Sequence, residues 1–141
     1  MGVNIIFETL TILLKELDDN EYGDWIVDKE HKGTMDDPIQ MPFVIYGQVV
    51  RKLEREIYAF DEGHPEMELR NYQEILEKNN IRWETRSMEN ADVNNLDGQC
   101  VMALLLGAVR AERFCDGALL GFCESGAVKK WLERLLELDD V

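Results

Sequence analysis

Four charged residues interrupt the most apolar part of the sequence: Arg110, Glu112, Arg113 and Asp116. Carboxylates can transfer protons or bind a metal ion, and arginines can hold an anion, so these residue types could do chemistry. If one helix runs over residues 103–120, a rotation of about 100° per residue places Glu112 and Asp116 on one face. Arg113 is three residues from both Arg110 and Asp116, which is also a spacing of neighbours on a helix. The spacing therefore predicts a single charged cluster.

Leucines frame this cluster along the same predicted helix: Leu105, Leu106, Leu119 and Leu120. A helix that is apolar on all sides is normally buried, and a buried charge without a partner is strongly destabilising. The four charges sum to zero, so we expect them to pair with one another or to border a water-filled cleft. Glu112 and Asp116 would repel each other unless a nearby arginine or a metal ion lies between them.

Two interpretations of the cluster follow. We favour a structural ion-pair network that fixes the angle between core helices, because such networks also gather charges in protein interiors. The alternative is a small-ligand or anion-binding site, with or without enzymatic activity, formed by Arg110, Glu112, Arg113 and Asp116. No cofactor is implied, and no spacing of ligands supports a metal site, since His31 and His64 have the sequence context of exposed loop residues. The phosphate-binding and nucleophile motifs of common enzymes do not occur in the sequence.

The chain as a whole is strongly acidic. Its 141 residues, a length that suits one domain over residues 1–141, hold 15 Lys and Arg against 29 Asp and Glu, a formal net charge of −14. Such a surface repels phosphate backbones and anionic membranes, so we expect no direct binding to nucleic acid or to a membrane. Solubility is the simplest explanation of the charge. The sharper alternatives are a docking surface for a basic partner and a mimic of nucleic-acid charge.

Three cysteines lie in apolar stretches: Cys100, Cys115 and Cys123. Their number is odd and no C-x-x-C pair occurs, so we expect free, buried thiols in the reducing cytoplasm. The first 17 residues lack a basic segment and contain Glu8, which argues against a secretory signal. The longest apolar run, from Cys100 to Val109, is ten residues and therefore predicts a buried core helix rather than a membrane span.

Apolar residues recur at helical spacing over four stretches: 3–17, 46–60, 69–76 and 128–138. Residues near Trp25 and Phe43 could form a small two-stranded β-ribbon, and residues 81–95 predict a loop or a broken helix. We therefore expect an all-α or mainly helical fold, a compact single domain of five or six helices around residues 96–122. Trp25, Trp83 and Trp131 are expected to be core or helix-packing residues first and interface anchors second.

Small residues recur at every fourth position on two tracks: Ala103, Gly107, Ala111 and Cys115 on one, and Gly117, Gly121 and Ser125 on the other. Small side chains at this spacing form a groove that another helix can approach closely. This is a prediction about packing, and it carries no function by itself.

Residues 110–117, with the sequence Arg-Ala-Glu-Arg-Phe-Cys-Asp-Gly, are followed by Glu124-Ser-Gly and a final helix. These features, together with the Met-Pro-Phe-Val-x-Tyr element at residues 41–46, resemble a bacterial family designated only as a domain of unknown function. The resemblance covers roughly residues 25–138. It implies a compact helical domain in which the charged cluster is a family feature, and it implies no activity, substrate or cofactor.

These observations predict a non-enzymatic interaction or regulatory module, because an acidic surface accompanies the lack of a catalytic signature. Its partner would be another protein or a second copy of the chain. The small-ligand site at the charged cluster is the alternative, and the mimic of nucleic-acid charge is the weaker one.

Overall fold

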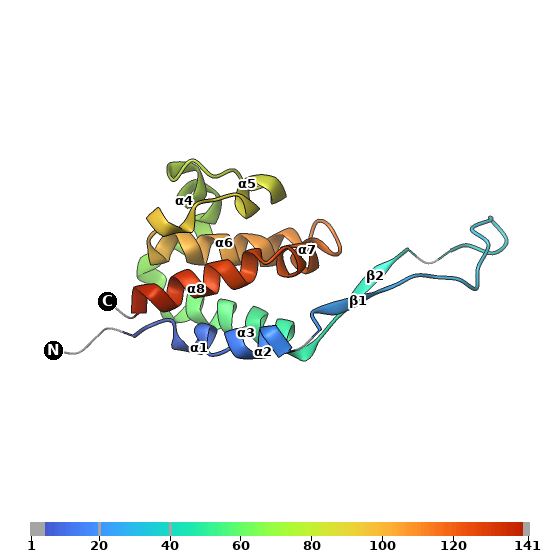
Figure 1. Cartoon of the computed structure of the whole chain (residues 1–141). Coiled ribbons are helices and arrows are strands. Elements are labelled where there is room, and N and C mark those ends of the chain that lie inside the picture. The colour runs from blue at the N-terminus through green and yellow to red at the C-terminus, as the bar shows by residue number, and fades with distance from the viewer. Residues whose placement is uncertain (1–4, 20, 40, 140–141) are drawn as a thin grey trace.

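One helix, α6 (Gly98–Ala111), lies at the centre of the molecule. The computed structural model describes residues 5–19, 21–39 and 41–139 of the chain. The run from Cys100 to Val109 is buried along its whole length, as its apolar sequence predicts. Asp97 begins the helix, because its carboxylate accepts the backbone N–H of Cys100 at 2.9 Å. Around α6 in Figure 1 are α3 (Gln48–Gly63), α4 (Tyr72–Lys78), α7 (Ala118–Glu124) and α8 (Ala127–Asp139).

The surrounding helices each bury one face, at the positions that the apolar periodicity predicts. The buried residues of α3 are Val49, Val50, Leu53, Ile57 and Phe60, and the apolar ones of α8 are Ala127, Val128, Trp131, Leu132 and Leu135. The predicted helix ends are also confirmed. Helix α3 ends before Pro65, and α7 ends before Ser125 and Gly126, where Gly126 takes a left-handed φ of 86°.

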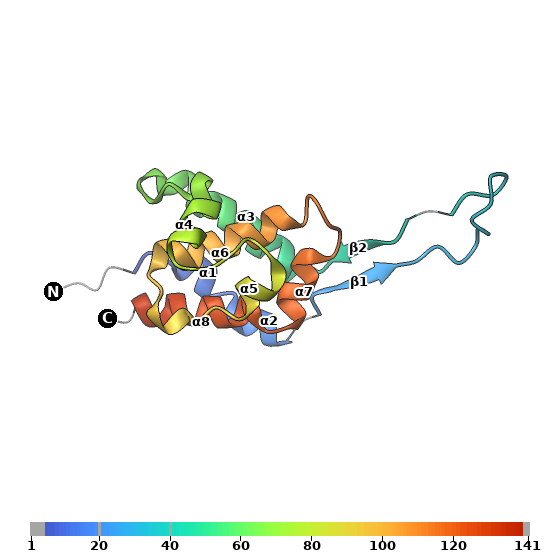
Figure 2. The same cartoon turned by 90° about the horizontal axis from the view of Figure 1, so that it is seen from above.

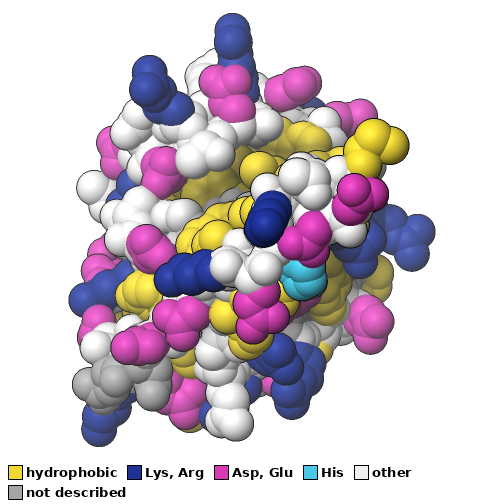
Figure 3. Space-filling model, turned by 90° about the vertical axis from the view of Figure 1, so that its right-hand side faces the viewer, with side chains coloured by type: hydrophobic (Ala, Val, Ile, Leu, Met, Phe, Trp, Pro, Cys, Tyr) yellow, Lys and Arg dark blue, Asp and Glu magenta, His cyan; other side chains and the backbone are white. Residues whose placement is uncertain are grey.

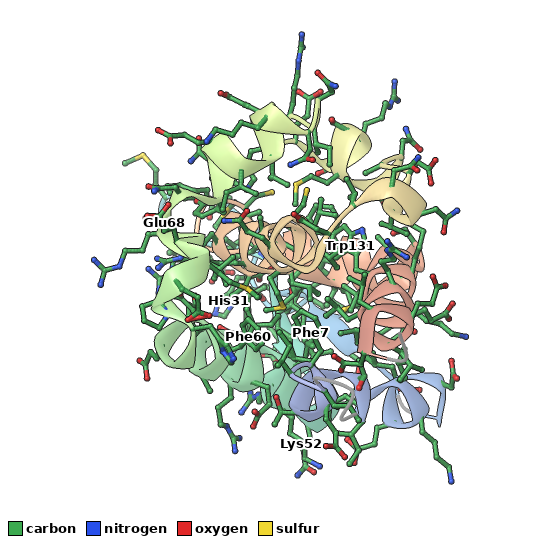
Figure 4. All side chains as sticks on the ribbon, turned by 90° about the vertical axis from the view of Figure 1, so that its left-hand side faces the viewer. Phe7, His31, Lys52, Phe60, Glu68 and Trp131 are labelled. Atoms are coloured by element: carbon green, nitrogen blue, oxygen red, sulfur yellow. The ribbon has the colours of Figure 1, made fainter. Side chains whose placement is uncertain are left out.

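The first amphipathic stretch folds as two short helices, α1 (Glu8–Thr11) and α2 (Leu14–Asp19), rather than one. Its stripe still faces the core through Leu10, Leu13 and Leu17, while the predicted Val3 lies outside the described residues. Figure 4 shows Phe7 and Phe60 directed toward each other, and their stacked ring centroids are 5.3 Å apart. This contact attaches the N-terminal helices to α3.

The chain between α3 and α6 turns repeatedly. It contains the 3-10 turns η1 (Pro65–Met67), η2 (Leu69–Asn71) and η3 (Val93–Asn95) and the short helix α5 (Thr85–Glu89). Residues 81–95 were predicted to form a loop or a broken helix, and the structure shows the second of these alternatives. The mainly helical fold with a small ribbon is confirmed, and the described part of the chain divides it into eight α-helical segments.

Two strands, β1 (Gly23–Ile26) and β2 (Phe43–Tyr46), form an antiparallel ribbon. Trp25 lies opposite Val44, and Ile26 lies opposite Phe43. Figures 1 and 2 show that this ribbon projects away from the helices and that the loop between its strands forms the far end. We refer to residues 21–47 as the arm and to the helices as the body.

No helix in the described ranges has both the length and the apolar character that crossing a bilayer requires.

Candidate functional site

The helix predicted over residues 103–120 is interrupted. Helix α6 ends at Ala111, residues 112–117 form a turn, and α7 begins at Ala118. Gly117 has a φ of 91°, a left-handed value that glycine adopts without strain and that stops a helix from continuing. The prediction that Glu112 and Asp116 share one helical face is therefore wrong.

Glu112 is the centre of a hydrogen-bond network in this turn. Its carboxylate accepts the Tyr46 hydroxyl at 2.7 Å, the backbone N–H of Gly117 at 3.1 Å and that of Leu119 at 3.0 Å. The Tyr46 oxygen accepts the backbone N–H of Leu120 at 3.0 Å. Helix α7 thus begins with its free N–H groups satisfied by side chains. The network also joins the base of the arm to the body, because Tyr46 is the last residue of β2.

Burial, and then the hydrogen bond to the Glu112 carboxylate, raise the pKa of the Tyr46 phenol far above its ordinary value. The phenol therefore keeps its proton near neutral pH and acts as the donor to Glu112. Three donors surround this carboxylate, which supports a structural role for Glu112.

The other three predicted site residues lie apart from this network. Arg110 is half-buried, with its guanidinium carbon 5.6 Å from the centre of the Tyr58 ring, a cation–π distance. Its Nε is buried and has no hydrogen-bond partner among the described residues. Arg113 and Asp116 are exposed, so the predicted enclosure by leucines is wrong for these two. In the described ranges no salt bridge joins any pair of the four, and ligand binding by them stays a prediction.

A groove of about 410 Å³ lies between α5 and the 112–117 turn. We call it the apolar groove. Its lining includes the apolar side chains of Trp83, Met88, Phe114 and Phe122, of which Met88 and Phe122 are nearly fully buried. Two carboxylates, Glu84 and Asp116, are also among its lining residues. Figure 3 shows hydrophobic side chains gathered in a hollow on the face of the molecule that carries the arm.

Tryptophan, rather than a second helix, occupies the space beside one predicted small residue. The Trp83 indole N–H donates to the Gly107 carbonyl oxygen at 2.9 Å. A Cβ placed on Gly107 would lie 3.3 Å from both Trp83 and Met88. The glycine thus lets the wall of the groove pack against the centre of α6.

Cys115 is exposed on the turn, so its predicted burial is wrong, and Phe114 beside it is exposed too. Phe114 is 79% exposed and meets Trp83 edge to face, with ring centroids 5.8 Å apart. Cys100 and Cys123 are buried as predicted, and burial raises the pKa of Cys100 to about 11 and that of Cys123 to about 12. The interruption of the helix explains the difference, because it turns residues 113–116 outward.

The arm has an inner and an outer face, because side chains alternate along a strand. On the inner face, the Trp25 ring covers Gly117 so closely that a Cβ at that position would clash with it. The outer face consists of Asp24, Ile26, Phe43 and Ile45. Trp25 is 48% exposed, so a place in the core is wrong for it, although its ring packs against Gly117 at the start of α7. Trp131 is fully buried, as predicted for a core residue.

The two histidines differ from each other. His31 is exposed near the far end of the arm, as predicted, and its Nδ1 lies 2.7 Å from Asp28. The prediction of an exposed His64 is wrong, because this half-buried ring stacks on Phe60 with centroids 3.9 Å apart. Within the described ranges, no group of three His, Cys, Asp or Glu residues is arranged to hold a metal ion.

The model of a family of unknown function, DUF6508, matches residues 7–141. The chain belongs to this family. Comparison with curated proteins and with solved structures finds no match. The predicted resemblance to a family of unknown function is confirmed, and the DUF6508 match includes the first helices as well as the arm and the turn.

Two functions of side chains in this DUF6508 member were missed in the sequence. The apolar spacing over residues 46–60 predicts a helical position for Tyr46, but this residue ends a strand and its hydroxyl donates to Glu112. Asp139, a buried residue at the end of α8, accepts the backbone N–H groups of Ile6 and Phe7 at 3.1 and 3.0 Å. Neither contact has a local sequence signal, because each joins residues far apart in the chain.

Proposed function

We propose that this protein is a non-enzymatic interaction module whose arm docks on a protein partner of net positive charge. One observation carries the proposal. Of the eleven large hydrophobic side chains exposed among the described residues, seven lie on the arm. They are Trp25, Ile26, Val27, Met35, Ile39, Met41 and Ile45.

The placement of these side chains supports docking. A two-stranded ribbon with one face toward the body normally presents polar residues on its other face. Here the outer face carries Ile26, Phe43 and Ile45, with Asp24 as its one charged residue. Contiguous apolar surface of this kind marks interaction sites on soluble proteins, and the outer edge of a strand can also accept a partner strand.

The charge of the arm supports a basic partner over a second copy. The arm holds six Asp and Glu residues against two Lys, and the whole chain has a net charge of −14. Two copies would therefore repel each other, whereas a basic surface would be attracted and would associate faster at low salt.

The contacts at the base of the arm indicate that the arm is fixed in position on the body before a partner binds. Tyr46 and Glu112 join β2 to the body, and Trp25 covers Gly117 beside them. An arm fixed in this way loses less conformational freedom when a partner binds.

The test compares the wild-type chain with an arm variant that carries Ile26→Ser, Met41→Ser and Ile45→Ser. The matched control carries Ile12→Ser and Leu136→Ser, two exposed residues of the body. Each protein is used to enrich partners from cells that encode it, and the enriched partner is then purified and titrated by calorimetry. We expect the wild type and the control to bind the same basic protein, more weakly as salt increases, and the arm variant to bind at least tenfold more weakly. Equal binding by the arm variant would contradict the proposal.

The alternatives make different predictions. A ligand site at Arg110, Glu112, Arg113 and Asp116 requires that substitution of Arg113 or Asp116 abolish binding of an anion or a metal ion. A mimic of nucleic-acid charge requires binding to nucleic-acid-binding proteins that depends on exposed carboxylates and persists in the arm variant.

A further inference from the structure

The apolar groove has the size and the walls of a small-molecule site. Its volume of about 410 Å³ lies within the range of ligand pockets. Trp83 and Phe114 form an edge-to-face pair at its side, and the nearly fully buried Met88 and Phe122 lie beneath its floor. Phe114 is 79% exposed, so most of its ring stays in water although one part of it meets Trp83. A ligand in the groove would remove part of this ring from water.

The charged residues that line the groove favour a ligand with a positive charge. Glu84 and Asp116 are the charged residues among its lining, and both are exposed. In the described part of the chain, neither carboxylate has an ion pair, and no Lys, Arg or His lines the groove. A positive charge would meet two carboxylates that have no ion pair in the described part of the chain, beside the aromatic side chains of Trp83 and Phe114, whereas an anion would be repelled.

We propose that the apolar groove binds a small organic cation, in which a compact aromatic or aliphatic group carries an ammonium or guanidinium charge. This site is separate from the outer face of the arm. The proposal therefore goes beyond the docking function and does not depend on it.

Gly121 provides a direct way to close the site. This residue lies in α7 and lines the groove, and a Cβ placed on it meets no atom within 4 Å. A larger side chain can therefore extend into the groove without a clash at its first atom. Gly63, at the end of α3, is equally open, lies outside the groove lining, and serves as the matched control.

The test titrates the full ¹⁵N-labelled chain with three probes of similar size: 2-phenylethylammonium, neutral 2-phenylethanol and anionic phenylacetate. We expect saturable shifts in the backbone amide signals of Gly117, Ala118 and Gly121. The Kd of the cation should be lower than that of the alcohol by roughly three- to tenfold, because two exposed carboxylates contribute modestly each. Phenylacetate should bind most weakly. The bound cation should also slow the reaction of Cys115 with a maleimide.

Variants assign these shifts to the groove. Gly121→Met should abolish saturable binding of the cation, while Gly63→Met should retain it, with circular dichroism used to confirm that both fold. The double variant Glu84→Gln and Asp116→Asn should bind the cation and the alcohol equally. The arm variant should bind the cation like the wild type, so failure of the groove and failure of the arm are distinguishable.

Three results would overturn the proposal. One is no saturable shift up to about 50 mM, several times the weakest Kd expected for about nine non-hydrogen atoms. Another is equal affinity of the wild type for the cation and the alcohol. The third is unchanged binding by a folded Gly121→Met variant.

Discussion

Cys115 and Cys123 are eight residues apart in the sequence and differ in their chemistry. Cys115 is exposed on the turn, whereas Cys123 is buried on α7 and Cys100 is buried on α6. Burial disfavours the thiolate, so it raises the pKa of Cys100 to about 11 and that of Cys123 to about 12. The thiolate is the reactive form of cysteine. At the scale of single residues, the protein therefore has one accessible thiol, and the other two can react only after the chain opens or unfolds.

We expect one fast-reacting thiol in the folded chain at pH 8, and we expect it to disappear in Cys115→Ser. The two buried thiols also make stability depend on alkaline pH. Their folded pKa values lie above the unfolded value of about 8.5, so their contribution is complete below about pH 8.5. Above that pH it is lost progressively until the pH passes the folded pKa values of about 11 and about 12, because over this range the unfolded chain has released the thiol protons and the folded chain still holds them. Unfolding in urea should show a loss of about 2 kcal/mol or more between pH 8 and pH 10.

The Cys115→Ser variant should show the same alkaline loss, because its substitution leaves both buried thiols in place. Equal reaction rates for all three thiols at pH 8 would contradict this account.

At the scale of elements, the arm and the α6–α7 turn are one assembly. Glu112 accepts Tyr46 from the arm and two backbone N–H groups from the turn and α7. A partly buried network of this kind loses more than one hydrogen bond when a member is removed, because the remaining groups are left unsatisfied.

Tyr46→Phe and Glu112→Gln should each lower the free energy of unfolding, by about 1–2 and about 1–3 kcal/mol respectively. The double variant should lose less than the sum, by roughly 0.5 kcal/mol or more, because both substitutions disrupt one network. Urea unfolding measures all three values. As a control, Glu124→Gln, at an exposed position of α7, should change the free energy of unfolding by less than about 0.5 kcal/mol. Additive losses would show that Tyr46 and Glu112 act independently.

Elements with a strong apolar period were predictable from the sequence, and so were the helix ends at Gly and Pro and the small ribbon, but the break between α6 and α7 was not. The stripes of α3 and α8 follow local spacing, which fixes the buried face of a helix wherever it packs. The break at residues 112–117 was missed because apolar residues continue on both sides of it. The residues that stabilise the break also lie far apart in the sequence. Gly117 permits the turn, but its hydrogen bonds come from Glu112, whose other partner is Tyr46.

The candidate site was predictable in part. The sequence predicts a candidate site at residues 110–116. The turn at these residues forms one side of the apolar groove through Phe114 and Asp116. The facing wall comes from Trp83 and Met88, whose approach depends on the position of α5 and has no local signal. For the arm, alternation predicts which residues share a face, but only the tertiary structure places Ile26 and Ile45 toward solvent.

At the scale of the whole molecule, an acidic chain carries an apolar arm. An exposed ribbon with hydrophobic side chains and free edges is normally an aggregation hazard. The net charge of −14 opposes association of two copies, because their surfaces repel each other at low salt. The net charge therefore opposes self-association through the arm, in agreement with the docking on a basic protein that we propose.

Self-association should therefore depend on salt. We expect sedimentation velocity to show a monomer in about 20 mM salt and weak oligomers in about 1 M salt, where the screening length falls to about 3 Å. The arm variant should remain monomeric in both, and the body control should behave like the wild type. A stable dimer of the wild type at low salt would show that the arm binds a second copy instead of a basic protein.

The two hydrogen bonds that Asp139 accepts from the backbone of Ile6 and Phe7 hold both ends of the described chain at one side of the body. They bring the first and last described turns together on the side away from the arm, as Figure 1 shows. A fluorophore, a bead or a neighbouring domain attached near either of these turns would therefore lie on the side of the body opposite the arm. The ribbon would then point away from the attached group and stay accessible to a partner.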